Sequence, residues 1–70
     1  MIVGSDRVDE GLKRALVAIG GYGALARALG ITKGAVWQWR QVPPRHVITI
    51  ERLTGIPREV LRPDLHPSRE

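Results

Sequence analysis

The chain has 70 residues, of which 11 are lysine or arginine and 7 are aspartate or glutamate, so its formal net charge is +4. This length accommodates one small domain, which buries too little surface for a deep catalytic cleft. The absence of cysteine excludes disulfides and thiolate zinc sites, and the wide separation of His46 and His66 argues against any other metal site. We therefore expect no metal and no cofactor.

The sequence indicates neither a membrane-spanning helix nor an export signal. No apolar run reaches the roughly 18 residues that a membrane-spanning helix needs. The first residues, 1–6, lack the charged and apolar regions of a signal peptide, so we expect a cytoplasmic protein. Residues 1–7 are predicted to be a flexible tail, residues 8–65 the single domain, and residues 66–70 a frayed end.

The first predicted element is an amphipathic helix. Ser5 or Asp6 would cap it, and Asp9 and Glu10 would place negative charge in its first turn. Apolar residues then recur at three- and four-residue steps, as in one buried helical face. These residues are Val8, Leu12, Ala15, Leu16 and Ile19. The glycine pair at 20–21 would end the helix.

Four further helices are predicted, each bounded by glycine or proline. Gly30 and Gly55 would end two of them, and Pro44 and Pro57 would begin the last two. The predicted ranges are 22–29, 33–41, 45–54 and 58–61, and the apolar stripe of the fourth helix is Val47, Ile50 and Leu53. Only the β-branched run 47–50 leaves a strand open as an alternative. The expected fold class is thus all-α, a compact bundle of about five short helices.

Residues 22–41 have the arrangement of a helix-turn-helix. Two helices would meet through a tight turn at Gly30, where glycine permits a positive φ. Ala26 would lie at the closest approach of the two helices. Apolar residues stand where they would lock the helices together: Leu25, Leu29, Ile31, Val36 and Trp39. The opposite face of the third helix would meet the major groove of DNA, and it consists of Thr32, Lys33, Gly34, Trp37, Gln38 and Gln41.

Two stretches of this segment also carry a family resemblance. Residues 24–32, ALARALGIT, and residues 35–39, AVWQW, resemble the helix-turn-helix of phage Cro repressors and of the related YdaS-type antitoxins. The likeness extends over roughly residues 8–67. It implies a lambda-repressor-like fold and a DNA-binding transcriptional regulator that occupies an operator as a repressor. It also implies a prophage or toxin–antitoxin context and a nucleoid location on DNA.

Two departures from the family pattern concern the expected DNA contacts. Where family members often have glutamine or threonine at the start of the second helix, this chain has Tyr22 and Gly23. Phosphate contact would then depend on backbone N–H groups or on the Tyr22 hydroxyl. Trp37 stands where a small polar residue or tyrosine is common. Its side chain cannot accept a hydrogen bond, so its contacts would be apolar or through the indole N–H.

Each candidate contact residue has an alternative role. Trp37 could pack on DNA, join a dimer contact or fold against Tyr22. Gln38 is the best candidate for reading a base, because glutamine can pair with adenine through two hydrogen bonds. The basic residues Lys33, Arg40 and Arg45 would bind phosphate or remain solvated.

Four other residues are expected to have no direct part in binding. Arg27 could pair with an acid, His46 is expected at the surface, and Glu51 and Arg52 are expected to be structural.

The sequence supports one primary function and one rival. A single short helix reads only a few base pairs, so a sequence-specific regulator calls for a homodimer, preformed or assembled on DNA. The rival is an antitoxin or interaction module that binds a protein through its C-terminal third. An exposed apolar patch would favour this rival, formed by Ile56, Val60, Leu61 and Leu65. An enzyme is not expected, because the chain has no nucleophile–base pair, and its glycine cluster at 20–23 follows a helix instead of a strand.

Overall fold

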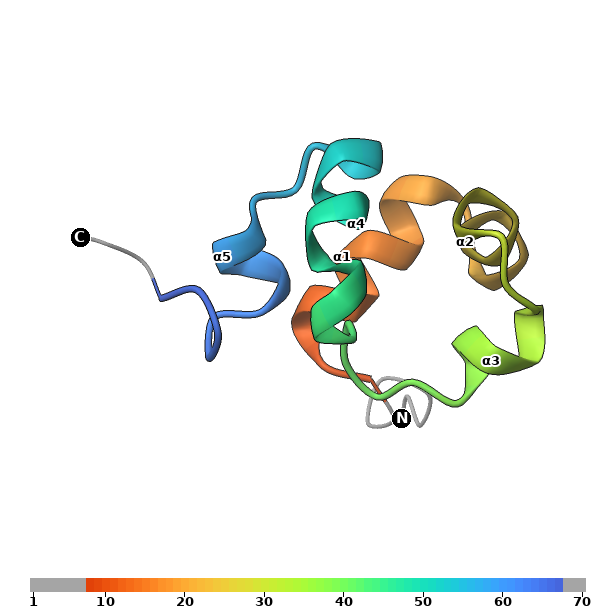
Figure 1. Ribbon diagram of the computed structural model, residues 1–70, viewed down its shortest axis with the longest axis horizontal. Coiled ribbons are helices and arrows are strands. Elements are labelled where there is room, and N and C mark those ends of the chain that lie inside the picture. The colour runs from red at the N-terminus through yellow and green to blue at the C-terminus, as the bar shows by residue number, and fades with distance from the viewer. Residues whose placement is uncertain (1–7, 68–70) are drawn as a thin grey trace.

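Short helices account for the regular structure in the computed structural model, which describes residues 8–67 (Figure 1). In chain order they are α1 (Glu10–Ile19), α2 (Tyr22–Leu29), α3 (Lys33–Trp37), the 3-10 helix η2 (Pro44–His46), α4 (Val47–Thr54) and α5 (Arg58–Leu61). No strand occurs within the described range, and the run 47–50 forms the start of α4. The predicted all-α class is confirmed. The tail predicted at residues 1–7 lies outside the described residues, and so do residues 68–70 of the frayed end predicted at 66–70. His66 is described: it is half-buried, and its N–H donates to the carbonyl of Arg62 at 2.9 Å.

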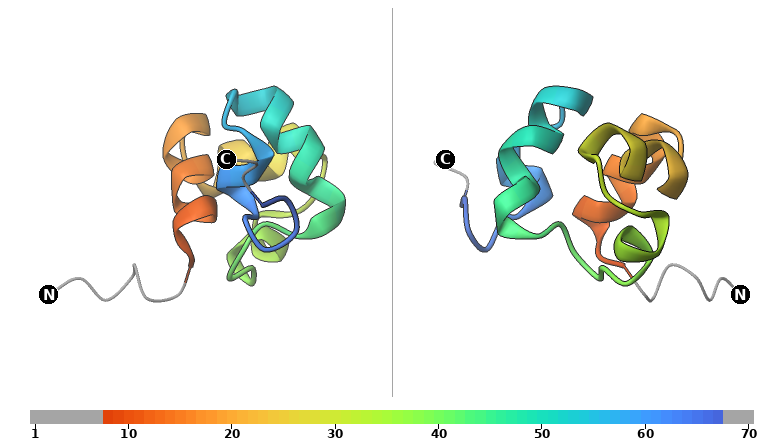
Figure 2. Two further views of the ribbon diagram at one scale, coloured as in Figure 1. Left: turned by 90° about the vertical axis from the view of Figure 1, so that its left-hand side faces the viewer. Right: turned by 45° about the vertical axis from the view of Figure 1, so that its right-hand side comes forward.

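The helices form two groups that share α1. On one side, α5 packs against both α1 and α4, and it lies between them in the left view of Figure 2. On the other side, α2 and α3 pack against each other, and α2 also contacts α1. In Figure 1, α3 and the chain that leaves it run along one edge of the molecule, beneath α1 and α4. The α2–α3 pair is therefore joined to the α1–α4–α5 group through the contact of α2 with α1.

One apolar core joins all five α-helices. Its buried hydrophobic residues are Leu12, Ala15, Leu16, Leu25, Ala26, Val36, Val42, Val47, Ile50 and Leu61. The predicted stripe of α1 is confirmed, because Val8 and Ile19 pack against this core as well. The predicted stripe of α4 is wrong at Leu53, which is 47% exposed near the C-terminal end of the helix.

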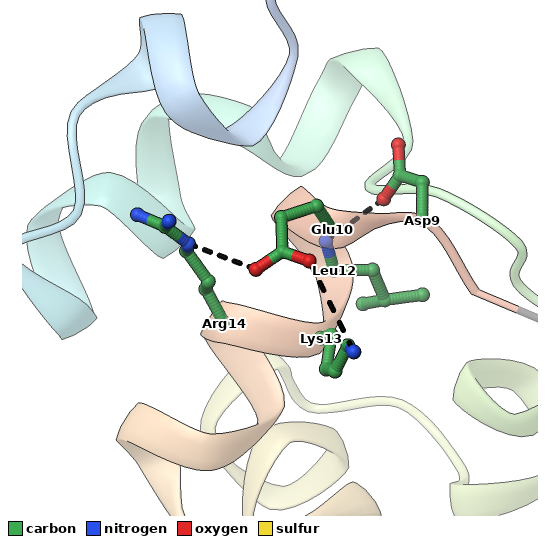
Figure 3. A network of polar contacts seen from close by, with 5 residues as sticks. All are labelled: Asp9, Glu10, Leu12, Lys13 and Arg14. Atoms are coloured by element: carbon green, nitrogen blue, oxygen red, sulfur yellow. Dashed lines mark hydrogen bonds and ion pairs between the residues drawn. The ribbon is translucent and has the colours of Figure 1, made fainter. Parts of the chain in front are cut away.

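The start of α1 differs from the prediction. Asp9, not Ser5 or Asp6, is the N-cap: its Oδ1 accepts a hydrogen bond from the N–H of Leu12 at 2.9 Å (Figure 3). Ser5 and Asp6 themselves lie outside the described residues. The physical reason for the later start is tertiary, because the Asp9 N–H donates to the carbonyl of Arg40 at 2.8 Å and holds Asp9 in an extended conformation.

Gly11 allows α5 to lie directly on α1. A Cβ atom at this position would clash with the carbonyl oxygen of Leu61 and would approach the carbonyl oxygen of Val60 to 2.8 Å. Both of these atoms belong to the backbone and cannot move aside as a flexible side chain would. The role of Gly11 is not predictable from the sequence, because a glycine within a helix shows its packing role only when the neighbouring helix is known.

The third helix is shorter than predicted. It ends at Trp37, with Gln38 as its C-cap, so Arg40 and Gln41 lie in the following loop and not on the helix. The final backbone bonds run from Gln38 to Ala35 and from Trp39 to Val36, which is the i to i−3 pattern of a tightening last turn. The chain then extends toward α1.

Candidate nucleic-acid interface

The turn between α2 and α3 has the geometry that its sequence predicted. Gly30 adopts a left-handed conformation with φ of +73°, and the Ile31 N–H then donates to the carbonyl of Ala26 at 3.0 Å. A residue with a Cβ atom rarely adopts this φ. Ala26 is only 3% exposed, in keeping with its expected place where α2 meets its neighbours. These features confirm a helix-turn-helix arrangement.

One side of α3 is packed and the other is open. Val36 is fully buried, whereas Lys33, Gly34 and Trp37 are exposed on another face, at the i, i+1 and i+4 positions of one helical surface. Thr32 caps the helix, because its Oγ1 accepts a hydrogen bond from the Ala35 N–H at 3.1 Å. The Thr32 hydroxyl is exposed and remains able to donate a hydrogen bond outward.

Trp37 lies against Tyr22. Their ring centroids are 4.9 Å apart and their planes are inclined by 59°, while 51% of Trp37 stays exposed. Tyr22, the first residue of α2, is half-buried and packs against the core. Of the three roles considered for Trp37, the fold against Tyr22 is the one present in the isolated chain. About half of the surface of this residue is therefore accessible to solvent.

The other predicted contact residues continue from the end of α3. Gln38 keeps a helical backbone conformation at the C-cap, so its exposed side chain follows the face of Gly34. Arg40 and Gln41 are exposed in the loop, and Arg45 is exposed in η2. The structure thus places three predicted contact residues on one face of α3, namely Lys33, Gly34 and Trp37. Four others follow along the segment that leaves the helix, namely Gln38, Arg40, Gln41 and Arg45.

Two backbone contacts hold this loop in place. The Arg40 carbonyl accepts from the Asp9 N–H, and the Val42 carbonyl accepts from Nη1 of Arg62 at 2.7 Å. Arg62 is only 5% exposed and also donates two hydrogen bonds to Asp64, at 2.9 and 2.7 Å. The hydrogen bonding between Arg62 and Asp64 is the largest influence on the ionisation of both groups. It raises the pKa of Arg62 and lowers the pKa of the Asp64 carboxyl to about 2.

The role of Arg62 was not predicted from the sequence. Arginine is seldom fully buried unless it is paired. The only local signal was an aspartate two residues later, at Asp64, and nothing in the sequence linked either residue to Val42, 20 positions earlier.

His46 also differs from its prediction. It is half-buried, not at the surface, and its ring stacks on Trp39 with a centroid distance of 5.3 Å and an interplanar angle of 30°. Burial, and then the charge of Arg45, lowers the pKa of His46 below its ordinary value of 6.5. Trp39 lies against the core as expected, although it reaches the core from the loop and not from α3.

The charges of the chain are divided unevenly. Residues 11–50 contain six lysines and arginines and no aspartate or glutamate. Two of these cations, Lys13 and Arg14, pair with Glu10 at 3.9 and 3.1 Å across the first turns of α1 (Figure 3). The other four form no ion pair with a carboxylate within the described range: Arg27, Lys33, Arg40 and Arg45. A scan of the sequence for acidic residues would have found this stretch.

Two acidic residues after position 50, Glu51 and Asp64, form ion pairs with arginines. Glu51 pairs with Arg58 at 3.0 Å and also accepts the backbone N–H of Arg58, which is the first residue of α5. The expectation of a structural Glu51 is therefore confirmed. Arg52 differs from the same expectation, because it is exposed on the last turn of α4. Within residues 8–67 no three metal-ligating side chains come together, and no helix has the length and apolarity to cross a membrane.

The fold and the exposed face of α3 define a small helix-turn-helix protein, in which the segment around α3 is basic and contains no acidic residue. A family model described as "Bacterial toxin YdaS" matches residues 12–70, so the chain belongs to the YdaS family. The predicted family is confirmed, although the model is described as a toxin and the sequence resemblance was to antitoxins. Membership indicates a small toxin-like, antitoxin-like or regulatory protein. No curated protein and no solved structure matches the chain.

Proposed function

We propose that the protein is a sequence-specific DNA-binding regulator that places α3 in the major groove of an operator and acts as a Cro-like repressor. The observation that carries this proposal is the open face of α3, formed by Lys33, Gly34 and Trp37, within a stretch of the chain that has no acidic residue. DNA is a dense polyanion, and its binding is dominated by lysine and arginine contacts with phosphate. No catalytic role forms part of the proposal.

The residues divide into two roles in this proposal. Gln38 reads a base edge, since a glutamine amide can both donate to and accept from adenine. Lys33, Arg40 and Arg45 contact phosphates on either side of α3, and their exposure without carboxylate partners leaves their charge available. The remaining proposed contacts are made by Thr32, Gly34, Trp37, Gln41 and Tyr22.

A homodimer on a two-fold operator is the proposed stoichiometry. A five-residue α3 spans little more than one turn, so a single copy reads only a few base pairs. Two copies would read half-sites about one helical turn of DNA apart.

The rival, a module that binds a protein through the C-terminal third, has less support. It needed an apolar patch of Ile56, Val60, Leu61 and Leu65, but Leu61 is fully buried in the core, and Ile56 and Val60 are half-buried. Leu65 is the large apolar side chain of that set that stays exposed, at 43%. One exposed leucine does not make a continuous docking patch.

Selection of bound sequences from a random DNA pool tests the proposal. The expected result is a palindromic consensus, which would define both the operator and the two-fold stoichiometry. Gln38→Ala should then lose about 1–3 kcal/mol of discrimination at one position in each half-site while melting like the wild type. Failure to enrich any sequence, together with affinity that does not respond to salt, would reject the proposal. An unchanged preference profile would reject the role of Gln38 alone.

A further inference from the structure

Trp37 is held in a defined position, although half of it is exposed. Its ring lies 4.9 Å from that of Tyr22, and Tyr22 is in turn packed against the core from the first position of α2. Aromatic pairs at this distance and inclination are favourable arrangements. The exposed part of Trp37 thus belongs to a supported ring and not to a freely rotating side chain.

No side chain projects from the helix surface beside Trp37, because Gly34 occupies that position. Gly34 lies one turn before Trp37 on the same face, and a Cβ atom built on it would meet nothing within 4 Å. The absence of a side chain at Gly34 lets another molecule approach the backbone of α3 and reach the flank of the indole. Lys33, one residue earlier, supplies positive charge at the edge of this surface.

The chemistry of this surface is selective among base edges. An indole carries a single N–H donor and no acceptor, and the rest of its ring is apolar. In the major groove the apolar group on a base edge is the 5-methyl group of thymine. A polyanionic partner is favoured over an apolar protein surface, because the surrounding segment 11–50 has six basic and no acidic residues.

We infer that Trp37, supported by Tyr22 and unobstructed by Gly34, recognises a thymine in each operator half-site through its 5-methyl group. This inference rests on the proposed function and deepens it. It names a second specificity-determining residue beside Gln38 and a chemical group that this residue reads. The operator should therefore contain a thymine, at a fixed spacing from the base read by Gln38, that makes no hydrogen bond with the protein.

The experiment uses the full chain and the operator obtained by selection. Each thymine of a half-site is replaced singly by deoxyuridine, which removes only the methyl group and leaves base pairing unchanged. At one position the affinity of the wild type should fall about fourfold, which corresponds to about 0.8 kcal/mol for one buried methyl-sized group. Cytosine and 5-methylcytosine at that position provide the reverse comparison, and the methylated base should bind more tightly.

Two variants connect the effect to the side chain. Trp37→Ala should bind the thymine and deoxyuridine operators equally. Tyr22→Phe keeps the supporting ring and should retain the fourfold ratio between them, although loss of its hydroxyl, a proposed phosphate contact, should weaken binding to both operators alike. Circular dichroism of both variants separates a loss of recognition from a loss of folding. Trp37→Phe keeps a smaller apolar ring and should retain part of the difference if Trp37→Ala does not fold.

The outcomes distinguish the two proposals. Sequence-specific binding in which no thymine is sensitive to loss of its methyl group overturns the inference and leaves the proposed function intact. The same conclusion follows if Trp37→Ala, or Trp37→Phe where only that variant folds, retains the full sensitivity of the wild type. Absence of any specific DNA binding overturns both.

Discussion

The guanidinium of Arg62 donates a hydrogen bond from Nη1 to the backbone carbonyl of Val42, at 2.7 Å, and so joins the turn after α5 to the loop that leaves α3. The same side chain binds Asp64 through two further hydrogen bonds. Among the described residues the buried polar or charged side chain is Arg62, and no buried side-chain nitrogen or oxygen there lacks a hydrogen-bond partner.

Replacement of Arg62 by methionine should destabilise the fold. The variant leaves the Val42 carbonyl without its donor and removes a charge-assisted hydrogen bond, which costs about 1.5–3 kcal/mol in the free energy of unfolding. Urea unfolding followed by circular dichroism measures this difference. Arg52→Met is the matched control, because Arg52 is an exposed arginine, and its loss should change stability by less than about 0.5 kcal/mol. Equal effects of the two variants would contradict the structural role of Arg62.

Two glycine-to-alanine substitutions within helices should have opposite effects. Gly11→Ala brings a Cβ atom against the backbone carbonyls of Val60 and Leu61, so it should destabilise the fold by about 1–3 kcal/mol. Gly23→Ala meets nothing within 4 Å, and alanine is the better helix former, so it should stabilise by up to about 1 kcal/mol. Thermal melting of both variants compares them, and a stabilised Gly11→Ala would mean that α5 does not lie directly on α1.

The junction of α2 with its neighbours is sensitive to side-chain size. Ala26→Leu adds volume at a site that is 3% exposed and should cost about 1–3 kcal/mol. Ala28→Leu, on the exposed side of the same helix, is the matched control and should leave the melting temperature nearly unchanged. Gly30→Val should also lower the melting temperature, because valine at a φ of +73° is strained. Wild-type melting of both Ala26→Leu and Gly30→Val would contradict the helix-turn-helix geometry.

Stability should fall as the pH drops below 6.5. The pKa of His46 is lower in the folded chain, chiefly through burial, so the unfolded chain binds a proton first as the pH falls through 6.5. The folded state is therefore favoured above that pH and loses this advantage below it. Asp64 acts in a separate window: its pKa is lowered from 3.8 to about 2, so its contribution is present above 3.8 and is lost toward pH 2.

Melting temperatures at pH 7.5 and pH 5 isolate the histidine from the aspartate. The wild type should melt at a lower temperature at pH 5. His46→Phe keeps a ring against Trp39 but cannot titrate, so its melting temperature should change less between the two values. A pH response that is identical in this variant would show that another group is responsible.

The proposed phosphate contacts predict a characteristic response to salt. The logarithm of the affinity should fall linearly with the logarithm of the salt concentration, with a slope of about −0.9 for each phosphate neutralised. Lys33→Ala and Arg45→Ala should weaken binding to all DNA sequences alike, and each should make the slope shallower by about one. Arg52→Ala removes the same charge from the far end of α4 and should leave the slope unchanged. Equal slopes in all four proteins would exclude Lys33 and Arg45 as phosphate contacts.

The sequence by itself determined the helices and the turn between α2 and α3. Glycine and proline act locally, so the positions of Gly30, Gly55 and Pro57 predicted helix ends that the structure confirms. The periodic stripe of α1 likewise identified buried positions without knowledge of their partners, since helical spacing alone brings them to one face.

Only the tertiary structure decided the features that depend on distant partners. The cap at Asp9 and the early end of α3 follow from contacts that join Asp9 to Arg40 and Val42 to Arg62. Tyr22 and Trp37, in different helices, meet only because the turn brings α3 back against α2. Local sequence encodes which conformations a segment prefers, whereas a hydrogen bond between residues 20 positions apart forms only when the whole chain has brought them together.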